Sequence, residues 1–369
     1  MIQNKQIAVI IRITETCNLR CRYCFAKTSS VNTHLSLEHF TVLLQDLIEA
    51  GYQHFDLFWE GGEPLLVGIP FFRQIITIQQ DIKTRYNISI SNKLQTNATL
   101  ITQQWIEFFQ DQHFQVGISL DGDSFINDKN RIFSNGHSSF NRVINSINLM
   151  QSKGIHVGIL SVLTLENINY IHEYYSFIKS IGVSSFKINP CFINKDLNKY
   201  MQIRPEEWGE AMIQLFNLWF NDNNPPWNAD FSGYIKSLFL GHSTFCMFNQ
   251  KCLTGFLCLV PNGDMFPCSR LANEHSDFYL GNISNGLPAI LSKWKSLNRN
   301  FEKIGCNDCK WLDICHGGCT AYTYWMHHTI HSKDYLCDGY KKLFQHISNV
   351  VQTMDINKKT ERKQNYDWK

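Results

Sequence analysis

The sequence predicts an α/β fold in which parallel strands alternate with helices. Short apolar runs and amphipathic stretches alternate six times in the first half of the chain, and polar motifs follow the ends of the runs. This order predicts a parallel sheet with crossover helices, which curls into an open or partial (β/α)6 barrel. The loops that follow the strands then form the active face.

The strand and helix positions follow from the two periodicities. Apolar runs predict strands at residues 6–13, 54–59, 88–97, 114–121, 156–164 and 184–189. Amphipathic spacing predicts helices at residues 36–50, 71–85, 102–112, 139–153, 168–181, 205–220 and 339–354. The linker Asn221–Trp227 marks the end of the barrel. We therefore predict a barrel over residues 1–225, a cysteine-rich domain over 226–340, and a C-terminal helix and tail over 341–369.

Composition narrows the class of protein. The chain has 369 residues, of which 44% are hydrophobic and 18% charged, as expected for a soluble protein of two domains. A net charge of +2 gives no reason to expect a nucleic-acid partner, and the basic tail 358–369 is expected to be solvated. The short apolar run at the N-terminus has no cleavage site, and no stretch is long enough to span a membrane, so we predict a cytoplasmic protein without a membrane partner.

The cysteines point to metal ligation. In a reducing cytosol, 13 cysteines favour metal binding over disulfides. Three of them lie between Cys17 and Cys24, nine lie between Cys246 and Cys337, and Cys191 stands alone. Two separate metal-binding regions are therefore expected.

The first region is the loop after the first predicted strand, where Cys17, Cys21 and Cys24 are separated by three and two residues. Three thiolates hold three irons of a cubane, and no fourth Cys or His lies nearby. The open iron can chelate the amino and carboxylate groups of a methionine-type cofactor. Zinc is the structural alternative, but it prefers four ligands in paired short spacings.

This loop resembles the signature of the radical S-adenosylmethionine (radical SAM) superfamily, with Tyr23 as the aromatic residue before the last cysteine. The segment Trp59–Pro64 resembles the family's GGEP segment, in which Gly61 and Gly62 allow the backbone to approach the cofactor and Glu63 accepts from its ammonium. The resemblance implies S-adenosylmethionine as cofactor, with Cys17, Cys21 and Cys24 as the catalytic cluster ligands. It implies hydrogen abstraction from a substrate by a 5′-deoxyadenosyl radical.

Later strand ends supply further cofactor contacts. Gln95 and Asn97 follow the third predicted strand and Ser119 ends the fourth, and both segments resemble cofactor or substrate contacts of related enzymes. Arg131 is a candidate partner for the cofactor carboxylate, because a guanidinium binds a carboxylate through two hydrogen bonds. Arg142 is an alternative for the same role.

The second cysteine region resembles the SPASM extension of radical SAM enzymes, which carries two auxiliary 4Fe–4S clusters. This resemblance implies that the first auxiliary cluster is held by Cys246, Cys252, Cys268 and Cys319. It implies that the second is held by Cys306, Cys309, Cys315 and Cys337. With the cluster of the first loop, the protein is expected to hold three 4Fe–4S clusters, and the complete ligand sets favour electron transfer and structure as the auxiliary roles.

Two cysteines, and a histidine next to a predicted ligand, lie outside these ligand sets. Cys258 lies in the apolar run Gly255–Val260 and is expected in the core. Cys191 follows Pro190 at the end of the sixth predicted strand. It is expected either in the core or on the active face. His316 lies between two cluster cysteines and is expected near the cluster or in solvent, without ligating it.

The substrate class rests on two resemblances. The whole chain resembles anaerobic sulfatase-maturating enzymes, which oxidise a Cys or Ser of a target protein to formylglycine. In that group an aspartate thought to act as the base follows the third ligand of the first auxiliary cluster, but here Ser269 follows Cys268. A tyrosine of that group, two residues beyond the last cysteine of the first loop, is replaced by Ala26.

The chain also resembles SPASM maturases of ribosomally synthesised peptides, including those that join an aromatic side chain to a nearby β-carbon as a cyclophane or ether. We favour this crosslinking function, with sulfatase maturation as the alternative. The partners are then a precursor peptide or target protein and an electron donor of flavodoxin or ferredoxin type. Only sixteen residues precede Cys17, so a leader peptide is expected to bind the barrel, the cysteine-rich region, a sheet edge or a separate protein.

A non-catalytic electron carrier is the alternative from a different class of protein. The GGEP-like segment argues against it, because an electron carrier does not need a methionine-binding loop.

Overall fold

The computed structural model describes residues 5–26, 33–192, 199–243, 245–272, 277–299 and 304–353. The chain divides into two compact units. The first contains Met1–Ser161 and Lys251–Arg299, and the second contains Val162–Gln250 and Asn300–Lys369. Among the described residues, no helix has the length and apolar character needed to cross a membrane.

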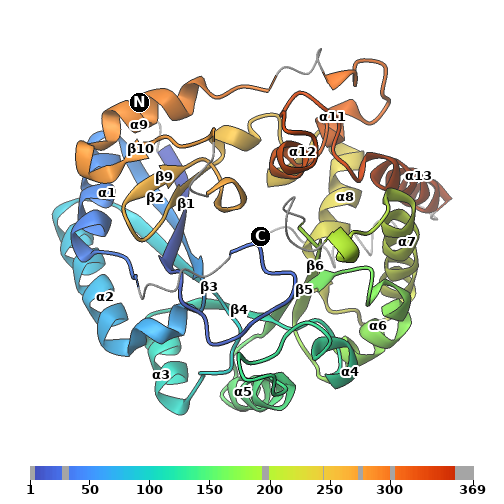
Figure 1. Ribbon diagram of the computed structural model, residues 1–369, viewed down its shortest axis with the longest axis horizontal. Coiled ribbons are helices and arrows are strands. Elements are labelled where there is room, and N and C mark those ends of the chain that lie inside the picture. The colour runs from blue at the N-terminus through green and yellow to red at the C-terminus, as the bar shows by residue number, and fades with distance from the viewer. Residues whose placement is uncertain are drawn as a thin grey trace. The chain divides into compact units, whose positions relative to one another are not determined.

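The first unit is built on a parallel sheet. Its strands are β1 (Lys5–Thr14), β2 (Tyr52–Gly61), β3 (Ser89–Thr96), β4 (Gln115–Ser119) and the start of β5 (Gly158–Leu163), paired in that order. Helices α1 (Leu37–Glu49), α2 (Gly68–Arg85), α3 (Gln103–Asp111) and α5 (Phe140–Ser152) connect the strands and lie outside them, and α4 (Ser124–Asn127) follows β4 (Figure 1). This arrangement confirms the predicted α/β class.

Local sequence explains these elements. In β1, Ile7, Val9, Ile11 and Ile13 are almost fully buried, as expected for a strand with neighbours on both sides. Helix α1 begins after Ser36, whose hydroxyl accepts a hydrogen bond from the backbone N–H of His39 at 3.2 Å. Its buried residues Phe40, Leu43, Leu44 and Leu47 follow the helical period and cover the sheet.

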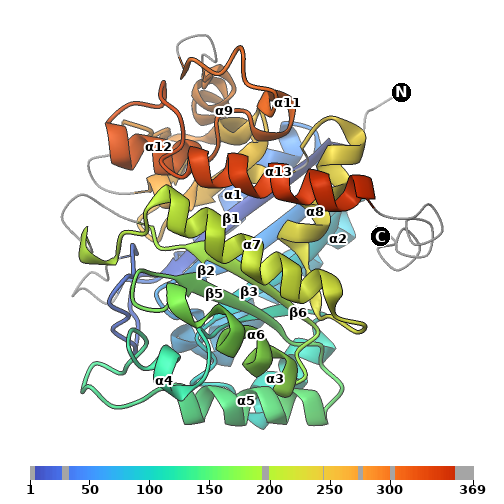
Figure 2. The ribbon, with the colours of Figure 1, turned by 90° about the vertical axis from the view of Figure 1, so that its right-hand side faces the viewer.

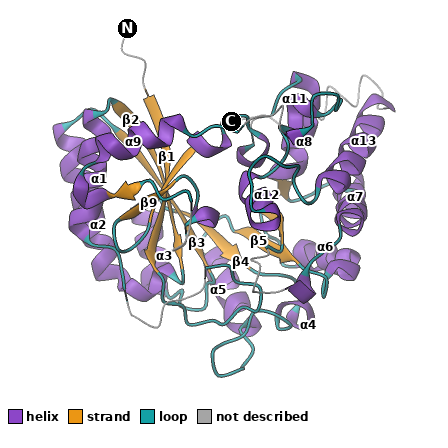
Figure 3. Ribbon diagram, turned by 45° about the horizontal axis from the view of Figure 1, so that its top comes forward, coloured by secondary structure: helices purple, strands orange, loops and turns teal. Residues whose placement is uncertain are grey.

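The cysteine-rich part of the chain extends the same sheet in the first unit. Strand β8 (Phe256–Leu259) pairs in parallel with β1, β9 (Asp264–Phe266) pairs antiparallel with β8, and β10 (Gly281–Asn282) pairs with β9. Helix α9 (Leu287–Ser296) follows and packs against α1 (Figure 3). Cys258 is fully buried in β8 beside Val260 and Phe266, which confirms its predicted place in the core.

The second unit contains strands and two groups of helices. Strand β6 (Ser185–Pro190) pairs in parallel with β7 (Trp227–Asn228). The first group of helices is α6 (Ile171–Ser180), α7 (Pro205–Asn221) and α8 (Ala229–Leu240). The second group is α11 (Leu312–Cys315), α12 (Thr320–His327) and α13 (Cys337–Thr353).

Helices α7 and α13 run side by side (Figure 2). Two glycines permit this close approach, because a Cβ on Gly339 would lie 2.2 Å from the carbonyl oxygen of Pro205 and one on Gly209 would lie 2.9 Å from the Cα of Gly339. Trp208 and Tyr340 pack edge to face beside this contact, with ring centroids 6.2 Å apart. The C-terminal helix is thereby fixed to the helix that follows β6 in the same unit.

All six predicted strands and all seven predicted helices are present, with ends that differ by about three residues or fewer. The 3₁₀ turn Ile168–Tyr170 accounts for the earlier start predicted for α6. The pairing of β8 with β1 was not predicted. The domain limits 1–225, 226–340 and 341–369 stay a prediction, and the basic tail 358–369 lies outside the described residues.

The α7–α13 contact gives a stability prediction. Gly339→Ala is expected to destabilise the protein by about 1–2 kcal/mol, because the clash of the new methyl group with a backbone oxygen exceeds the gain in helix propensity. Urea unfolding followed by circular dichroism under anaerobic conditions measures the change. Ser348→Ala on the same helix is the control and should stay within about 0.5 kcal/mol of wild type. Equal unfolding midpoints for Gly339→Ala and wild type would show that the two helices accommodate the methyl group without a loss of stability.

Candidate active site

The cysteine loop follows β1 in the first unit and is held by backbone hydrogen bonds. Arg20 N–H donates to the carbonyl of Ile132 at 2.8 Å, and Arg22 N–H donates to that of Asn130 at 3.1 Å. Within the loop, Cys24 N–H donates to the Cys21 carbonyl at 3.1 Å, and Leu19 N–H donates to the Cys17 sulfur at 3.4 Å. The loop is therefore fixed along its length against residues 130–132.

The three thiols form one electrostatic group. Burial raises the pKa of Cys17 to about 11 and that of Cys21 to about 12, and it also raises the pKa of Cys24. The charge of Arg131 opposes the rise at all three sulfurs. The thiols thus hold their protons at neutral pH, and binding of iron has to displace them.

This donor set fits an iron–sulfur cubane. Among the described residues, no three Cys, His, Asp or Glu side chains are grouped to hold a single metal ion. A cubane binds each thiolate to a different iron, so its ligands do not have to converge on one point. Three buried thiols on one fixed loop match that requirement.

A buried polar chain lies beside the cysteines. The Tyr23 hydroxyl donates to an Asp121 carboxylate oxygen at 2.6 Å and accepts from an Arg131 guanidinium N–H at 2.6 Å. All three side chains are less than a tenth exposed, and burial raises the pKa of Tyr23 well above its usual value. Arg142, the alternative to Arg131, is exposed on α5 with its guanidinium 5.5 Å from the centre of the Phe133 ring.

Asp121 lies in the segment Ser119–Gly122 that the sequence points to, although only Ser119 of that segment is predicted as a contact. Its signal was an acidic residue directly after a buried strand. Its contact with Tyr23 joins the end of β4 to the cysteine loop. The role of Arg131 toward a cofactor carboxylate stays a prediction.

The GGEP-like segment is packed against the chain that leads into the cysteine loop. Gly62 N–H donates to the Thr14 carbonyl and Glu63 N–H to the Thr16 carbonyl, both at 2.8 Å. A Cβ on Gly61 would lie 2.2 Å from the Thr14 oxygen, and one on Gly62 would lie 2.1 Å from the Thr16 oxygen. Gly61 also has a φ of +131°, which favours glycine. Both glycines are thus required by the protein's own backbone, and their contact with a cofactor stays a prediction.

Glu63 joins the ends of β2 and β3. It is fully buried, and one carboxylate oxygen accepts from the Thr96 hydroxyl at 2.6 Å and from Leu65 N–H at 3.0 Å. The other oxygen accepts from Asn97 N–H at 2.8 Å. Three protein donors therefore hold this carboxylate, and its predicted contact with the cofactor ammonium stays a prediction.

Asn97 connects this junction to the cysteine loop. Its amide donates to Asn18 at 2.8 Å, and the same nitrogen lies 3.9 Å from the Cys17 sulfur. Gln95 donates to the Ser119 hydroxyl at 2.8 Å and links the ends of β3 and β4. The structure thus places the predicted contacts of the first unit on neighbouring strand ends.

A second carboxylate, Glu60, lies at the end of β2 and was not predicted. The hydroxyl of Ser269, which is 5% exposed, donates a hydrogen bond to the Glu60 carboxylate. Arg12 pairs with Glu60 in the β1–β2 register, donates to the Ala272 carbonyl at 3.0 Å and lies 3.9 Å from a carboxylate oxygen of Glu15. The sequence signal was the acidic residue directly before the two glycines.

One predicted auxiliary set is brought together in the second unit. Cys306, Cys309, Cys315 and Cys337 line one cavity, and burial raises the pKa of Cys315. His316 lies beside it with a ring nitrogen 2.7 Å from the Phe248 carbonyl oxygen. Cluster ligation by these four cysteines stays a prediction, as does the other set, Cys246, Cys252, Cys268 and Cys319.

Cys191 is buried in the second unit. It is 3% exposed, and its N–H donates to the Leu163 carbonyl at 2.7 Å. The Tyr322 hydroxyl donates to the Cys191 carbonyl oxygen. Both of its backbone polar groups are thus used within the unit.

Comparison with known proteins identifies the domain that carries the cysteine loop. Residues 11–178 match the family model described as the radical SAM superfamily. The protein is a radical SAM enzyme. This radical SAM enzyme is 28% identical to the cysteine-type anaerobic sulfatase-maturating enzyme of Clostridium perfringens over 359 residues, which cover 89% of this chain and 93% of that protein. It is 27% identical to the serine-type enzyme of Klebsiella aerogenes over 355 residues, which cover 91% and 83%.

The solved structures agree with this identification. The radical SAM enzyme superposes on native anSMEcpe with bound AdoMet with a TM-score of 0.83 and 26% identity, covering 95% of this chain and all of that one. Streptococcus suis SuiB bound to precursor peptide SuiA has a TM-score of 0.63 at 16% identity, over 90% and 76% of the two chains, and shows a shared fold only. The predicted radical SAM fold is confirmed.

The Glu63 junction gives a prediction on site stability. Glu63→Gln leaves at least one of its three buried donors without an acceptor, so we expect a loss of about 1–3 kcal/mol in unfolding free energy. Anaerobic urea unfolding measures this loss, and the iron content after reconstitution should fall with it. Glu107→Gln, at an exposed carboxylate on α3, is the control. A midpoint for Glu63→Gln equal to that of Glu107→Gln would show that Glu63 does not hold the strand ends.

Proposed function

We propose that this radical SAM enzyme is a maturase of a ribosomally synthesised peptide, from which it removes two hydrogens to form a crosslink between an aromatic side chain and a neighbouring residue. The observation that favours this proposal over sulfatase maturation is the residue that follows Cys268, which is Ser269. Sulfatase-maturating enzymes, by the resemblance described above, use an aspartate directly after the third ligand of the first auxiliary cluster. Here that position is a serine, and the carboxylate comes from β2.

To remove two hydrogens, the protein has to take a hydrogen atom, a proton and an electron from the substrate. When bound, S-adenosylmethionine and its reducing cluster supply the abstraction of one hydrogen atom. Formation of a new bond then requires the substrate to lose one proton and one electron. The eight predicted auxiliary cysteines are the ligands for one-electron acceptors of the iron–sulfur class. The described side chains can accept the proton that the substrate loses.

Glu60 and Ser269 are the proposed proton acceptors. A serine hydroxyl alone is a poor base near neutral pH, whereas a carboxylate is a common general base in enzymes. Ser269 can take the substrate proton while its own proton passes to the Glu60 oxygen to which it is hydrogen bonded.

Sulfatase maturation is the second candidate. It is favoured by the two sulfatase-maturating relatives, which match this chain at 27–28% identity along most of its length. Oxidation of a Cys or Ser to formylglycine also needs removal of a proton, so the Glu60–Ser269 pair is compatible with both functions. The substrate and the product distinguish them.

Mass spectrometry of a coexpressed peptide tests the proposed function. We expect a small peptide encoded beside this gene to lose two hydrogens per modified site, with the change mapping to an aromatic residue and a neighbour. The variant Cys17→Ala/Cys21→Ala/Cys24→Ala is the control and should leave the peptide unchanged. If the peptide stays unmodified while an active-site Cys or Ser of a sulfatase becomes an aldehyde, the second candidate is correct.

The proton acceptor is tested separately. Glu60→Gln should lower the rate of product formation by about 10²-fold or more, the size expected for loss of a base. Release of 5′-deoxyadenosine should continue, so the ratio of 5′-deoxyadenosine to product rises. The double variant Glu60→Gln/Ser269→Asp restores a carboxylate and should recover part of the product.

Glu15→Gln is the matched control, because Glu15 also lies near Arg12 but its carboxylate is not the acceptor for Ser269. It should keep the wild-type ratio. A wild-type ratio of 5′-deoxyadenosine to product in Glu60→Gln would exclude Glu60 as the proton acceptor and leave the crosslinking function standing.

A further inference from the structure

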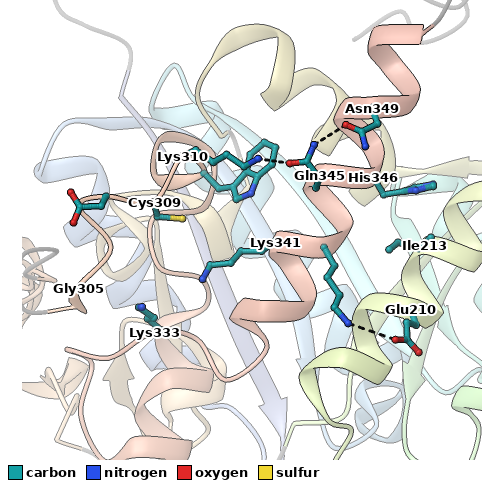
Figure 4. Close-up of a pocket in the computed structure, with 13 residues that line it drawn as sticks. Glu210, Ile213, Gly305, Cys309, Lys310, Lys333, Lys341, Gln345, His346 and Asn349 are labelled. Atoms are coloured by element: carbon teal, nitrogen blue, oxygen red, sulfur yellow. Dashed lines mark hydrogen bonds and ion pairs between the residues drawn. The ribbon is translucent and has the colours of Figure 1, made fainter.

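A lysine-rich hollow of about 890 Å³ lies on the second unit (Figure 4). Helices α7 and α13 and the segment 305–311 form its walls. Four lysines line it, namely Lys310, Lys333, Lys341 and Lys342. Among the described residues, two carboxylates line it with them, Glu210 and Asp308. The lining therefore carries an excess of positive charge, in contrast to the near-neutral chain as a whole.

The lysines are directed to solvent. Lys310, Lys333 and Lys342 are exposed and Lys341 is half-buried. Lys342 lies 3.6 Å from Glu210 and Lys341 lies 3.4 Å from the exposed Asp338. Exposed ion pairs of this kind are weak, so these ammonium groups can exchange their present carboxylates for those of a partner.

One lysine is fixed in position. The Lys310 ammonium donates to the Gln345 side chain, and the Gln345 amide donates to Asn349 at 2.7 Å along α13 (Figure 4). The same ammonium lies 4.7 Å from the centre of the Trp311 ring. The hollow thus presents a positioned cation next to an aromatic surface.

The hollow shares a wall with the cavity of the second cysteine set. Cys309, Trp311, Lys333 and Lys341 line both of them. Cys306, Cys315 and Cys337 line only the inner cavity. The positively charged hollow therefore meets the lining of the predicted cluster at Cys309.

We propose that this hollow docks an acidic protein that carries one electron at a time. The inference rests on the proposed function, because it takes Cys306, Cys309, Cys315 and Cys337 as ligands of an auxiliary cluster. Carboxylates around the partner's redox group pair with the four lysines and bring that group against Trp311 and Cys309. In the exchange the auxiliary cluster, which holds the electron taken from the substrate, loses one electron and the oxidised carrier gains it.

Charge complementarity is the physical basis of the proposal. A patch of one sign steers an oppositely charged partner and raises its association rate, and the effect falls with salt. A carrier has to dissociate after each electron, which weak and exposed ion pairs permit. A fully buried apolar interface would hold it too long.

The test measures binding of an acidic flavodoxin to the cluster-loaded enzyme at low and physiological ionic strength. Lys333→Glu/Lys342→Glu should weaken binding by about tenfold or more and make it less dependent on salt. Lys153→Glu/Lys295→Glu is the matched control, since both of its lysines are exposed on the first unit and line neither cavity. It should bind like wild type.

A second readout separates docking from catalysis. After the enzyme has been reduced and freed of reductant, stopped-flow absorbance should show oxidised flavodoxin gaining an electron more slowly from Lys333→Glu/Lys342→Glu than from the control. Equal flavodoxin affinities for this variant and the control would overturn the proposal. So would a variant that loses affinity for the substrate peptide while flavodoxin binding is unchanged, because the hollow would then be a peptide site. Failure to find a crosslinked product would count against the proposed function and would leave the binding result valid.

Discussion

The site depends on one contact, the close approach of the Gly61–Gly62 backbone to the chain between β1 and the cysteine loop. The carbonyls of Thr14 and Thr16 accept from the backbone of the GGEP-like segment, and no side chain fits between them. This contact fixes where the loop leaves the sheet. The loop is held further along by Asn97, by Asp121 and by the backbone of residues 130–132.

From this contact a network of buried polar groups extends across the strand ends. Glu63 joins β2 to β3, Asn97 joins β3 to the cysteine loop, and Asp121 joins β4 to Tyr23. Each of these side chains is almost fully buried and each has hydrogen-bond partners, which is the condition for placing polar groups in a core without a large loss of stability. The same network places Arg131 where its charge acts on the three thiols, so stability and the electrostatics of the site have a common cause.

Features that depend on residues close together in the sequence could be predicted from it, whereas contacts between residues far apart in the sequence could not. Strands and helices were predicted because burial periodicity is a local property, and the cysteine loop was found because its ligands are close in sequence. The pairing of β8 with β1 was missed, since those strands are about 250 residues apart and only packing selects their register. The contacts of Glu60 and Asp121 were missed for the same reason: each is recognised by the residue that it contacts, Ser269 or Tyr23, and neither contact is visible in a local motif.

The Ser269–Glu60 contact places a carboxylate from β2 beside the segment that follows Cys268. A proton acceptor is defined by where its oxygen lies relative to the substrate, and the fold brings β2 and the segment after Cys268 to the same place. A carboxylate supplied from either segment can therefore reach that place, provided that a hydroxyl or the substrate itself bridges the remaining distance. In the proposed mechanism the two segments share this role, because β2 supplies the carboxylate of Glu60 and the segment after Cys268 supplies the hydroxyl of Ser269.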